Sequence, residues 1–177
     1  TPFERRELLG VHPQKQEGKM RVGILVPTGR LSADECRDLA DLADKYSSGE
    51  IRLTVEQNII LPNVDEDKVK ALKKEKALGR KSRLEVEPGF IEGNVVSCTG
   101  AEFCGLALVE TKANAEKIGK KLEELVEVDR PIRIHWTGCP NSCGQVQVAD
   151  IGIMGAPAKK EIDGKKMAVP GCKIFVG

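Results

Sequence analysis

The amino-acid sequence predicts an α+β protein made of two consecutive halves, each combining strands with helices. Two observations predict this class. Short apolar runs bounded by Pro or Gly alternate with longer stretches in which apolar residues recur every three or four positions, as expected for strands and amphipathic helices. The stretch "EPGFIEG" at residues 87–93 interrupts this alternation, and both kinds of element resume beyond it. We therefore expect a boundary between the halves near residue 87.

The first half opens with residues 1–18, which are polar and interrupted by Pro and Gly, and we interpret them as a leader segment or extended arm. A folded unit is expected over residues 19–86. Its first element is the apolar run "MRVGILVP" at residues 20–27, which is bounded by Pro and Gly and predicts a buried strand.

A helix is expected within residues 31–50, ending near Ser47–Gly49. Ser32 followed three residues later by Glu35 is a capping-box signature at its start. An apolar stripe with helical spacing follows, formed by Leu39, Leu42, Ala43 and Tyr46. The helix should bury this stripe against the strands.

Residues 51–64 predict two short strands around the polar "VEQN", and residues 65–79 predict a second, basic helix closed by Gly79. Strand, helix, strand pair and helix follow one another in the order of a ferredoxin-like half-repeat.

The second half, residues 87–177, is expected to be an α/β domain. A long helix is predicted over residues 112–128, followed by a strand at 131–136. Its apolar stripe comprises Ala115, Ile118, Leu122 and Leu125. Two further strands, "VADIGIMGA" and "CKIFVG", flank the turn "EIDGKK".

Composition limits the partners. The formal net charge is +1 and only 3% of the residues are aromatic, so neither nucleic acid nor a membrane surface is indicated. No apolar run reaches the roughly 20 residues of a membrane span, and the first residues carry no signal-peptide pattern. The chain begins without Met and stops in an apolar strand-like run, so we expect a part of something longer.

Four of the six cysteines form two close pairs. Five residues separate Cys98 from Cys104, and three separate Cys139 from Cys143. Zinc sites favour pairs separated by two residues, whereas a larger iron–sulfur cubane tolerates wider and unequal spacings because its irons lie on different corners. The pattern favours a four-thiolate cluster, with a zinc site or unpaired buried cysteines as the alternatives.

The residues around the cysteines fit the same interpretation. Several glycines flank both pairs, so backbone N–H groups can approach an anionic cluster closely. Pro140, directly after Cys139, suits the first turn of a helix. In such a turn the i, i+4 spacing would place the Cys139 and Cys143 sulfurs on one face.

The sequence around these cysteines resembles that of a known family. "SCTGAEFCG" followed by "HWTGCPNSCGQVQVADIG" resembles the cluster motif of the sirohaem-containing nitrite and sulfite reductases. The form "CPNSCGQVQVADIG" is similar to that of the ferredoxin-dependent nitrite reductases of plastids and cyanobacteria. Upstream, "ERRELLGVHPQKQEG" and "RLTVEQNIILPNV" resemble the second ferredoxin-like half-repeat of that family. The resemblance covers essentially the whole chain.

The resemblance implies that Cys98, Cys104, Cys139 and Cys143 bind a [4Fe-4S] cluster, and that Cys143 also bridges to the iron of sirohaem. The segment 52–58, with Gln57 and Asn58, would face the cofactor cavity. The implied reaction of the parent enzyme is six-electron reduction of nitrite to ammonium, with ferredoxin as the electron donor.

The resemblance also implies that this is the C-terminal part of the enzyme and that its sirohaem and [4Fe-4S] domain is incomplete. The anion-binding basic residues would belong to the missing N-terminal half, so no catalytic residue is expected here and the part alone should be inactive or nearly so. The implied compartment is the plastid stroma, or the cytoplasm of a cyanobacterium or other bacterium. Assimilatory sulfite reductase and a non-catalytic metal-binding or electron-transfer module remain the alternatives.

The remaining polar residues and cysteines have simpler interpretations. We expect His135 to be a structural, hydrogen-bonded histidine, and the basic run from Lys68 to Arg83 to be a solvated helix face rather than a ferredoxin-docking surface. Cys36 and Cys172 are expected to be packing residues.

Overall fold

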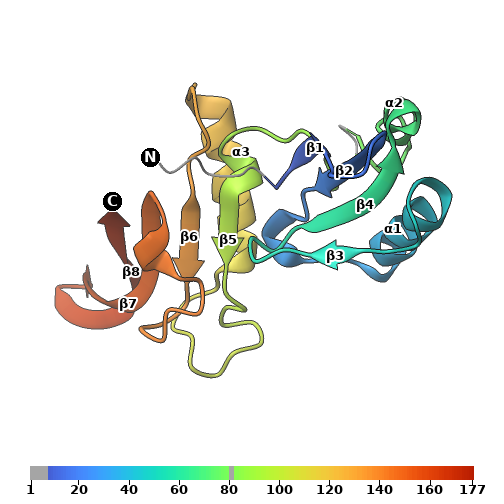
Figure 1. The fold of residues 1–177 in the computed structure, drawn as a ribbon. Helices are drawn as coiled ribbons and strands as arrows, with labels where there is room; N and C mark the ends of the chain where they lie inside the picture. Colours follow the sequence, from blue (N-terminus) through green and yellow to red (C-terminus); the bar gives the residue numbers. More distant parts are fainter. Residues whose placement is uncertain (1–7, 80–81) are drawn as a thin grey trace. The chain divides into compact units, whose positions relative to one another are not determined.

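The computed structural model describes residues 8–79 and 82–177, which form two compact units that divide between Pro88 and Gly89 (Figure 1). Each unit combines a four-stranded sheet with helices, so the expected α+β class is confirmed. None of the described helices is long and apolar enough to cross a membrane.

The sheet of the first unit is antiparallel and has the strand order β1-β2-β4-β3. Its strands are β1 (Gly10–Pro13), β2 (Lys19–Ile24), β3 (Arg52–Leu53) and β4 (Ile59–Asp65). Strand β1 falls inside the segment that we had interpreted as a leader. Residues 10–13 instead pair with β2 along the edge of the sheet, and residues 1–7 of that segment lie outside the described residues.

Helix α1 (Ala33–Tyr46) packs against this sheet and begins as predicted. The Ser32 side chain accepts a hydrogen bond from the Glu35 backbone N–H, and the Glu35 carboxylate accepts one from the Ser32 N–H. The whole predicted stripe, Leu39, Leu42, Ala43 and Tyr46, is buried. It shares one core with apolar residues of β2 and β4, among them Val22, Ile24, Ile59 and Leu61.

The second predicted helix is much shorter than expected. A 3-10 turn, η2 (Glu66–Lys68), leads into α2 (Val69–Leu72), after which the backbone N–H groups bond to carbonyls three residues back. Leu72 and Leu78 are both buried in the same core. In a continuous α-helix, residues six apart would lie about 120° apart around the axis, at the two edges of a buried face rather than at its centre. Tertiary packing therefore overrides the helical propensity of residues 73–79.

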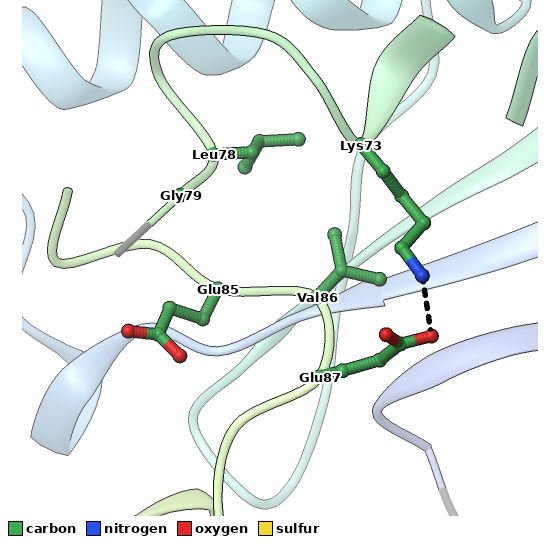
Figure 2. Close-up of a pocket in the computed structure, with 6 residues that line it drawn as sticks. All are labelled: Lys73, Leu78, Gly79, Glu85, Val86 and Glu87. Atoms are coloured by element: carbon green, nitrogen blue, oxygen red, sulfur yellow. Dashed lines mark hydrogen bonds and ion pairs between the residues drawn. The ribbon is translucent and has the colours of Figure 1, made fainter. Parts of the chain in front are cut away.

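After α2 the chain returns to the sheet at an isolated bridge between Leu25 and Glu85. Figure 2 shows the pocket beside this return, which has a volume of about 150 Å³. The Lys73 ammonium and the Glu87 carboxylate, 2.7 Å apart, form an ion pair at its edge. Its lining residues are Lys73, Leu78, Gly79, Glu85, Val86 and Glu87.

The second unit has a mixed sheet with the strand order β5-β6-β7-β8. Its strands are β5 (Val95–Ser97), β6 (Ile134–Thr137), β7 (Ile151–Ile162) and β8 (Lys165–Val176). Strands β5, β6 and β7 are parallel neighbours, and β8 is antiparallel to β7. Two 3-10 turns, η3 (Glu92–Asn94) and η4 (Val146–Val148), flank them. The β7–β8 hairpin confirms the strands expected around "EIDGKK".

Helix α3 (Lys112–Leu125) connects β5 to β6 as a crossover helix. Ala115 is buried and Ile118 and Leu122 pack partly into the core with Val95, Ile134 and Trp136, as expected. Leu125 is 65% exposed, so the predicted stripe ends one turn early. Gly119 takes part in its place, because a Cβ at this position would lie 2.9 Å from Val95 Cγ2. The helix therefore approaches β5 closely.

Candidate functional site

The two cysteine pairs follow two adjacent parallel strands. Cys98 comes directly after β5, and Cys139 lies two residues beyond the end of β6. Because parallel strands end at the same edge of a sheet, the loops that follow them start side by side. Figure 1 shows both loops, the yellow-green one after β5 and the orange one after β6, at the end toward which the two arrows point.

Backbone contacts hold Cys98 against the end of β6. The Cys98 N–H donates to the Trp136 carbonyl oxygen over 2.9 Å, extending the pairing of the strands by one residue. The Gly138 N–H in turn donates to Cys98 Sγ over 3.1 Å. The Cys98 sulfur therefore lies beside the residue that precedes Cys139.

The electrostatic surroundings of Cys98 favour a thiolate. Burial raises the pKa of this thiol, but hydrogen bonds from the Gly138 backbone, the Thr111 side chain and the Gly100 backbone outweigh burial and hold the pKa below its usual value. A thiolate is the form that ligates metal ions. N–H groups directed at the sulfur are also the groups that a buried anionic cluster needs.

Backbone hydrogen bonds also connect the loop that carries Cys104 to Gly138. The Cys104 N–H donates to the Gly100 carbonyl oxygen over 3.0 Å, and the Leu108 N–H donates to the Gly138 carbonyl oxygen over 2.8 Å. Gly138 is required for this approach, because a Cβ there would lie 2.6 Å from Ala107 Cβ. The backbone thus joins the loop of the first cysteine pair to the start of the second.

The segment from Cys139 to Cys143 is not the helical turn that we expected. The Ser142 N–H donates to the Cys139 carbonyl oxygen in a tight turn with Pro140 in its second position, and a second turn joins Gln145 to Ser142. Ser142 and Gln145 have φ values of +54° and +55°, which an α-helix cannot contain. Pro140 therefore fixes the backbone of a turn rather than the start of a helix.

His135 anchors this second turn to β6. Its ring is buried, and Nδ1 lies 2.8 Å from the Gly144 carbonyl oxygen and 3.1 Å from that of Gln145. Since both neighbours are acceptors, Nδ1 carries the proton and donates. The structural role predicted for His135 is thus confirmed, and its function is to hold the turn directly after Cys143.

The four thiols differ in their exposure to solvent. Cys139 is buried, Cys98 and Cys104 are partly exposed, and Cys143 is exposed. Over residues 8–79 and 82–177, no group of three or more His, Cys, Asp or Glu side chains is arranged to hold a single metal ion.

Gln57 and Asn58 lie in the first unit, in the turn between β3 and β4. They line a pocket of about 240 Å³ together with Val26, Gly29 and Leu53 among others. The Asn58 side chain is buried, and its Oδ1 accepts a hydrogen bond from the Val26 N–H over 3.0 Å. Asn58 thus has a structural role in the described contacts, and the expected contact of both residues with a cofactor stays a prediction.

Two cysteines differ from the sequence-based interpretation, and Thr111 is a residue that the interpretation missed. Cys36 and Cys172 are exposed, so the packing role expected for them is wrong. Thr111 is fully buried, and its hydroxyl donates to the Cys98 carbonyl oxygen over 2.7 Å. The sequence signal at Thr111 is a Thr just before a helical stripe, which by itself indicates only an N-cap.

Two protein-family profiles match this chain. The profile described as "Nitrite/Sulfite reductase ferredoxin-like half domain" matches residues 12–77, and the profile described as "Nitrite and sulphite reductase 4Fe-4S domain" matches residues 92–177. The chain belongs to the nitrite and sulfite reductase family. All four clustered cysteines lie in the matched 4Fe-4S domain, and Gln57 and Asn58 lie in the matched half domain.

Individual members of the nitrite and sulfite reductase family match nearly the whole chain. The chloroplastic ferredoxin–nitrite reductase of Spinacia oleracea is 55% identical over 99% of this chain, and the ferredoxin–nitrite reductase of Synechococcus elongatus is 50% identical over 99%. The solved structure of the NirA protein of Mycobacterium tuberculosis superimposes with a TM-score of 0.86 over 98% of the chain at 29% identity. The chain spans 29%, 33% and 31% of these three proteins respectively.

Proposed function

We propose that this chain is the C-terminal, cluster-binding part of a ferredoxin-dependent nitrite reductase. In the parent enzyme, nitrite would be reduced by six electrons to ammonium, with reduced ferredoxin as the donor. The identity of 55% to an enzyme named ferredoxin–nitrite reductase supports this choice of substrate and donor. The activity is proposed for the whole enzyme, because the chain spans only about a third of such relatives.

The observation that carries the proposal is the meeting of the two cysteine-bearing loops at the ends of β5 and β6. The Gly138 N–H donates to Cys98 Sγ, and the Leu108 N–H donates to the Gly138 carbonyl oxygen. A single glycine of the loop after β6 thus contacts the loop after β5 at two points.

The four cysteines are proposed as the ligands of a [4Fe-4S] cluster, with Cys143 shared between the cluster and the iron of sirohaem. The donor set fits this group, because thiolates bind iron–sulfur clusters and the Gly138 N–H already donates to one of the sulfurs. When bound, the cluster would relay electrons and sirohaem would supply the metal centre for nitrite. The residues of the chain hold the cluster, orient its ligand sulfurs and set the charge around them.

The first unit is proposed to contribute polar contacts to sirohaem. The carboxylates of sirohaem need cationic and amide groups as partners. A polar pocket of about 570 Å³ in this unit is lined by Lys15 and Arg21 together with Gln14 and Asn63. The smaller pocket with Gln57 and Asn58 offers amide groups. These two pockets are the candidate contact sites, and the remaining partners would come from the N-terminal half of the enzyme.

A plastid stroma is the proposed compartment if the source is a plant, in line with the chloroplastic relatives, and the cytoplasm if it is a cyanobacterium or other bacterium. Assimilatory sulfite reduction is the second candidate function, because both matched profiles are shared by nitrite and sulfite reductases.

A chimaeric enzyme tests the proposal. This chain would replace the matched segment of the Spinacia oleracea enzyme, with which it shares 55% identity. We expect ammonium formation from nitrite with reduced ferredoxin, and its loss in the Cys143→Ala chimaera, with Cys36→Ala as the matched control. A chimaera that binds its cofactors but reduces sulfite in preference to nitrite would contradict the nitrite assignment.

A further inference from the structure

Thr111 stands at the N-cap of helix α3 but does not cap it. Its side chain makes no capping hydrogen bond within the described part of the chain, although Thr is a preferred residue for that role. The Glu110 carboxylate accepts from the Ala113 N–H over 3.4 Å instead. Thr111 therefore departs from the usual capping role of a Thr at this position, and its side chain is fully buried.

The Thr111 hydroxyl is directed at Cys98. It donates to the Cys98 carbonyl oxygen over 2.7 Å, and Oγ1 lies 3.7 Å from Cys98 Sγ. Gly100 is packed against the same side chain, since a Cβ on Gly100 would lie 2.7 Å from Thr111 Oγ1. The N-cap residue of α3 therefore contacts the turn that begins at Cys98 directly.

The Thr111 hydroxyl has one hydrogen to donate, and the acceptor of that hydrogen determines which part of Cys98 the hydroxyl holds in place. The carbonyl oxygen of Cys98 receives it at the shorter distance, so the hydroxyl fixes the backbone of Cys98. The position of that backbone determines whether Sγ stays in line with the Gly138 N–H, 3.1 Å away. Through the Cys98 backbone, Thr111 thus acts on the hydrogen bond between the Gly138 N–H and the Cys98 sulfur, in addition to its own 3.7 Å contact with that sulfur.

We infer that Thr111 is a positioning residue for the cluster ligand Cys98 and that it helps to set the reduction potential of the cluster. This inference rests on the proposed [4Fe-4S] function. Reduction adds negative charge to the cluster, so an N–H group directed at a ligand sulfur stabilises the reduced form and raises the potential. Loss of the Thr111 hydroxyl should let Sγ move away from that N–H and lower the potential.

The test is an anaerobic redox titration of the iron–sulfur-loaded full chain, followed by electron paramagnetic resonance. For Thr111→Val we expect the midpoint potential to become more negative, by about a tenfold change in the reduction equilibrium, which corresponds to about 59 mV for one electron. Thr111→Ser keeps the hydroxyl and should restore the wild-type potential. Asn114→Ala removes another side-chain hydrogen bond at the same helix end, to the Glu110 carbonyl oxygen, and should leave the potential unchanged.

The outcomes separate this inference from the proposed function. A wild-type chain that takes up no iron and sulfide overturns both. A loaded Thr111→Val variant with the wild-type potential and spectrum overturns the positioning role alone. Failure of Thr111→Val to load supports the role if its iron-free form melts like the wild type and Thr111→Ser still loads. If the iron-free Thr111→Val variant is unfolded, Thr111 is a residue of the general core and the inference is wrong.

Discussion

The imidazole of His135 donates from one nitrogen toward two carbonyl oxygens, those of Gly144 and Gln145. It thereby fixes the backbone directly after Cys143, as Thr111 fixes the backbone of Cys98 on the other loop. At the scale of single residues, the cysteines are therefore placed by hydrogen bonds to their backbone rather than by contacts of the sulfur atoms alone.

His135→Phe should weaken this placement. Phe fills the buried space but removes the donor that the Gly144 carbonyl oxygen shares with Gln145, whose oxygen still accepts from the Val148 N–H, so we expect the free energy of unfolding to fall by about 1–3 kcal/mol. Iron uptake by the reconstituted chain should fall as well, because the turn after Cys143 is released. Urea denaturation and iron analysis measure the two effects.

His12→Phe is the matched control for this experiment. The His12 ring also contacts a backbone carbonyl oxygen, that of Leu9 at 2.6 Å, but it lies in the first unit. It should leave iron uptake unchanged. Equal loss of iron in both variants would show that His135 has no particular role at the cluster turn.

Cysteine spacing predicted the candidate ligands, but the residues that place them were only partly predictable. His135 was expected to be structural, and the structure adds which turn it holds. Thr111 carries the sequence signal of an N-cap, and only the fold shows that its hydroxyl reaches Cys98, thirteen residues away. Cys36 was wrongly expected to be packed, because a position on the edge of a helical stripe does not define burial.

At the scale of elements, the close approach of two loops depends on Gly138. Gly138→Ala would place a Cβ 2.6 Å from Ala107 Cβ and 3.2 Å from the Val109 carbonyl oxygen. We expect a loss of about 1–3 kcal/mol in the free energy of unfolding from overpacking, together with poor iron uptake. Chemical denaturation and iron analysis provide the measurements.

Gly105→Ala serves as the comparison, since no described atom lies within 4 Å of a Cβ built there. It lies in the loop that Gly138 contacts and should change the unfolding free energy by less than about 0.5 kcal/mol. If Gly138→Ala behaves like Gly105→Ala, the loops do not meet as the structure shows.

The capping box of α1 makes a separate prediction in the first unit. Ser32→Ala removes the acceptor for the Glu35 N–H and should lower the free energy of unfolding by about 1 kcal/mol. The effect should appear as a lower urea midpoint with an unchanged slope. Iron uptake should not change, and a change there would contradict a purely local role.

Elements with a clear start signal and a full apolar stripe were predicted well, and α1 is the best example. The predicted helix at residues 65–79 failed because tertiary packing buries both Leu72 and Leu78, which a continuous α-helix would place at the two edges of a buried face. The helical turn expected at Pro140 failed because Ser142 adopts a left-handed conformation, which no residue of the motif signals strongly.

At the scale of the whole molecule, the class and the order of most elements followed from the sequence. Strand β1 was missed because residues 10–13 are few and polar on one side, and their pairing with β2 depends on the tertiary fold. Composition indicated the boundary between the halves near residues 87–93, and the two compact units divide between Pro88 and Gly89. Membership in the family was indicated by the cysteine motif of the second unit together with the upstream segments of the first unit, and a family profile matches each unit.

The central claim is that Cys98, Cys104, Cys139 and Cys143 hold one [4Fe-4S] cluster. The most direct test is anaerobic iron, sulfide and zinc analysis with a visible spectrum, on the wild-type chain and on alanine variants of all six cysteines. We predict about four irons and four sulfides per wild-type chain, a sharp loss in each of the four ligand variants, and wild-type content in Cys36→Ala and Cys172→Ala. Stoichiometric zinc without iron, or a full cluster in Cys143→Ala, would contradict the claim.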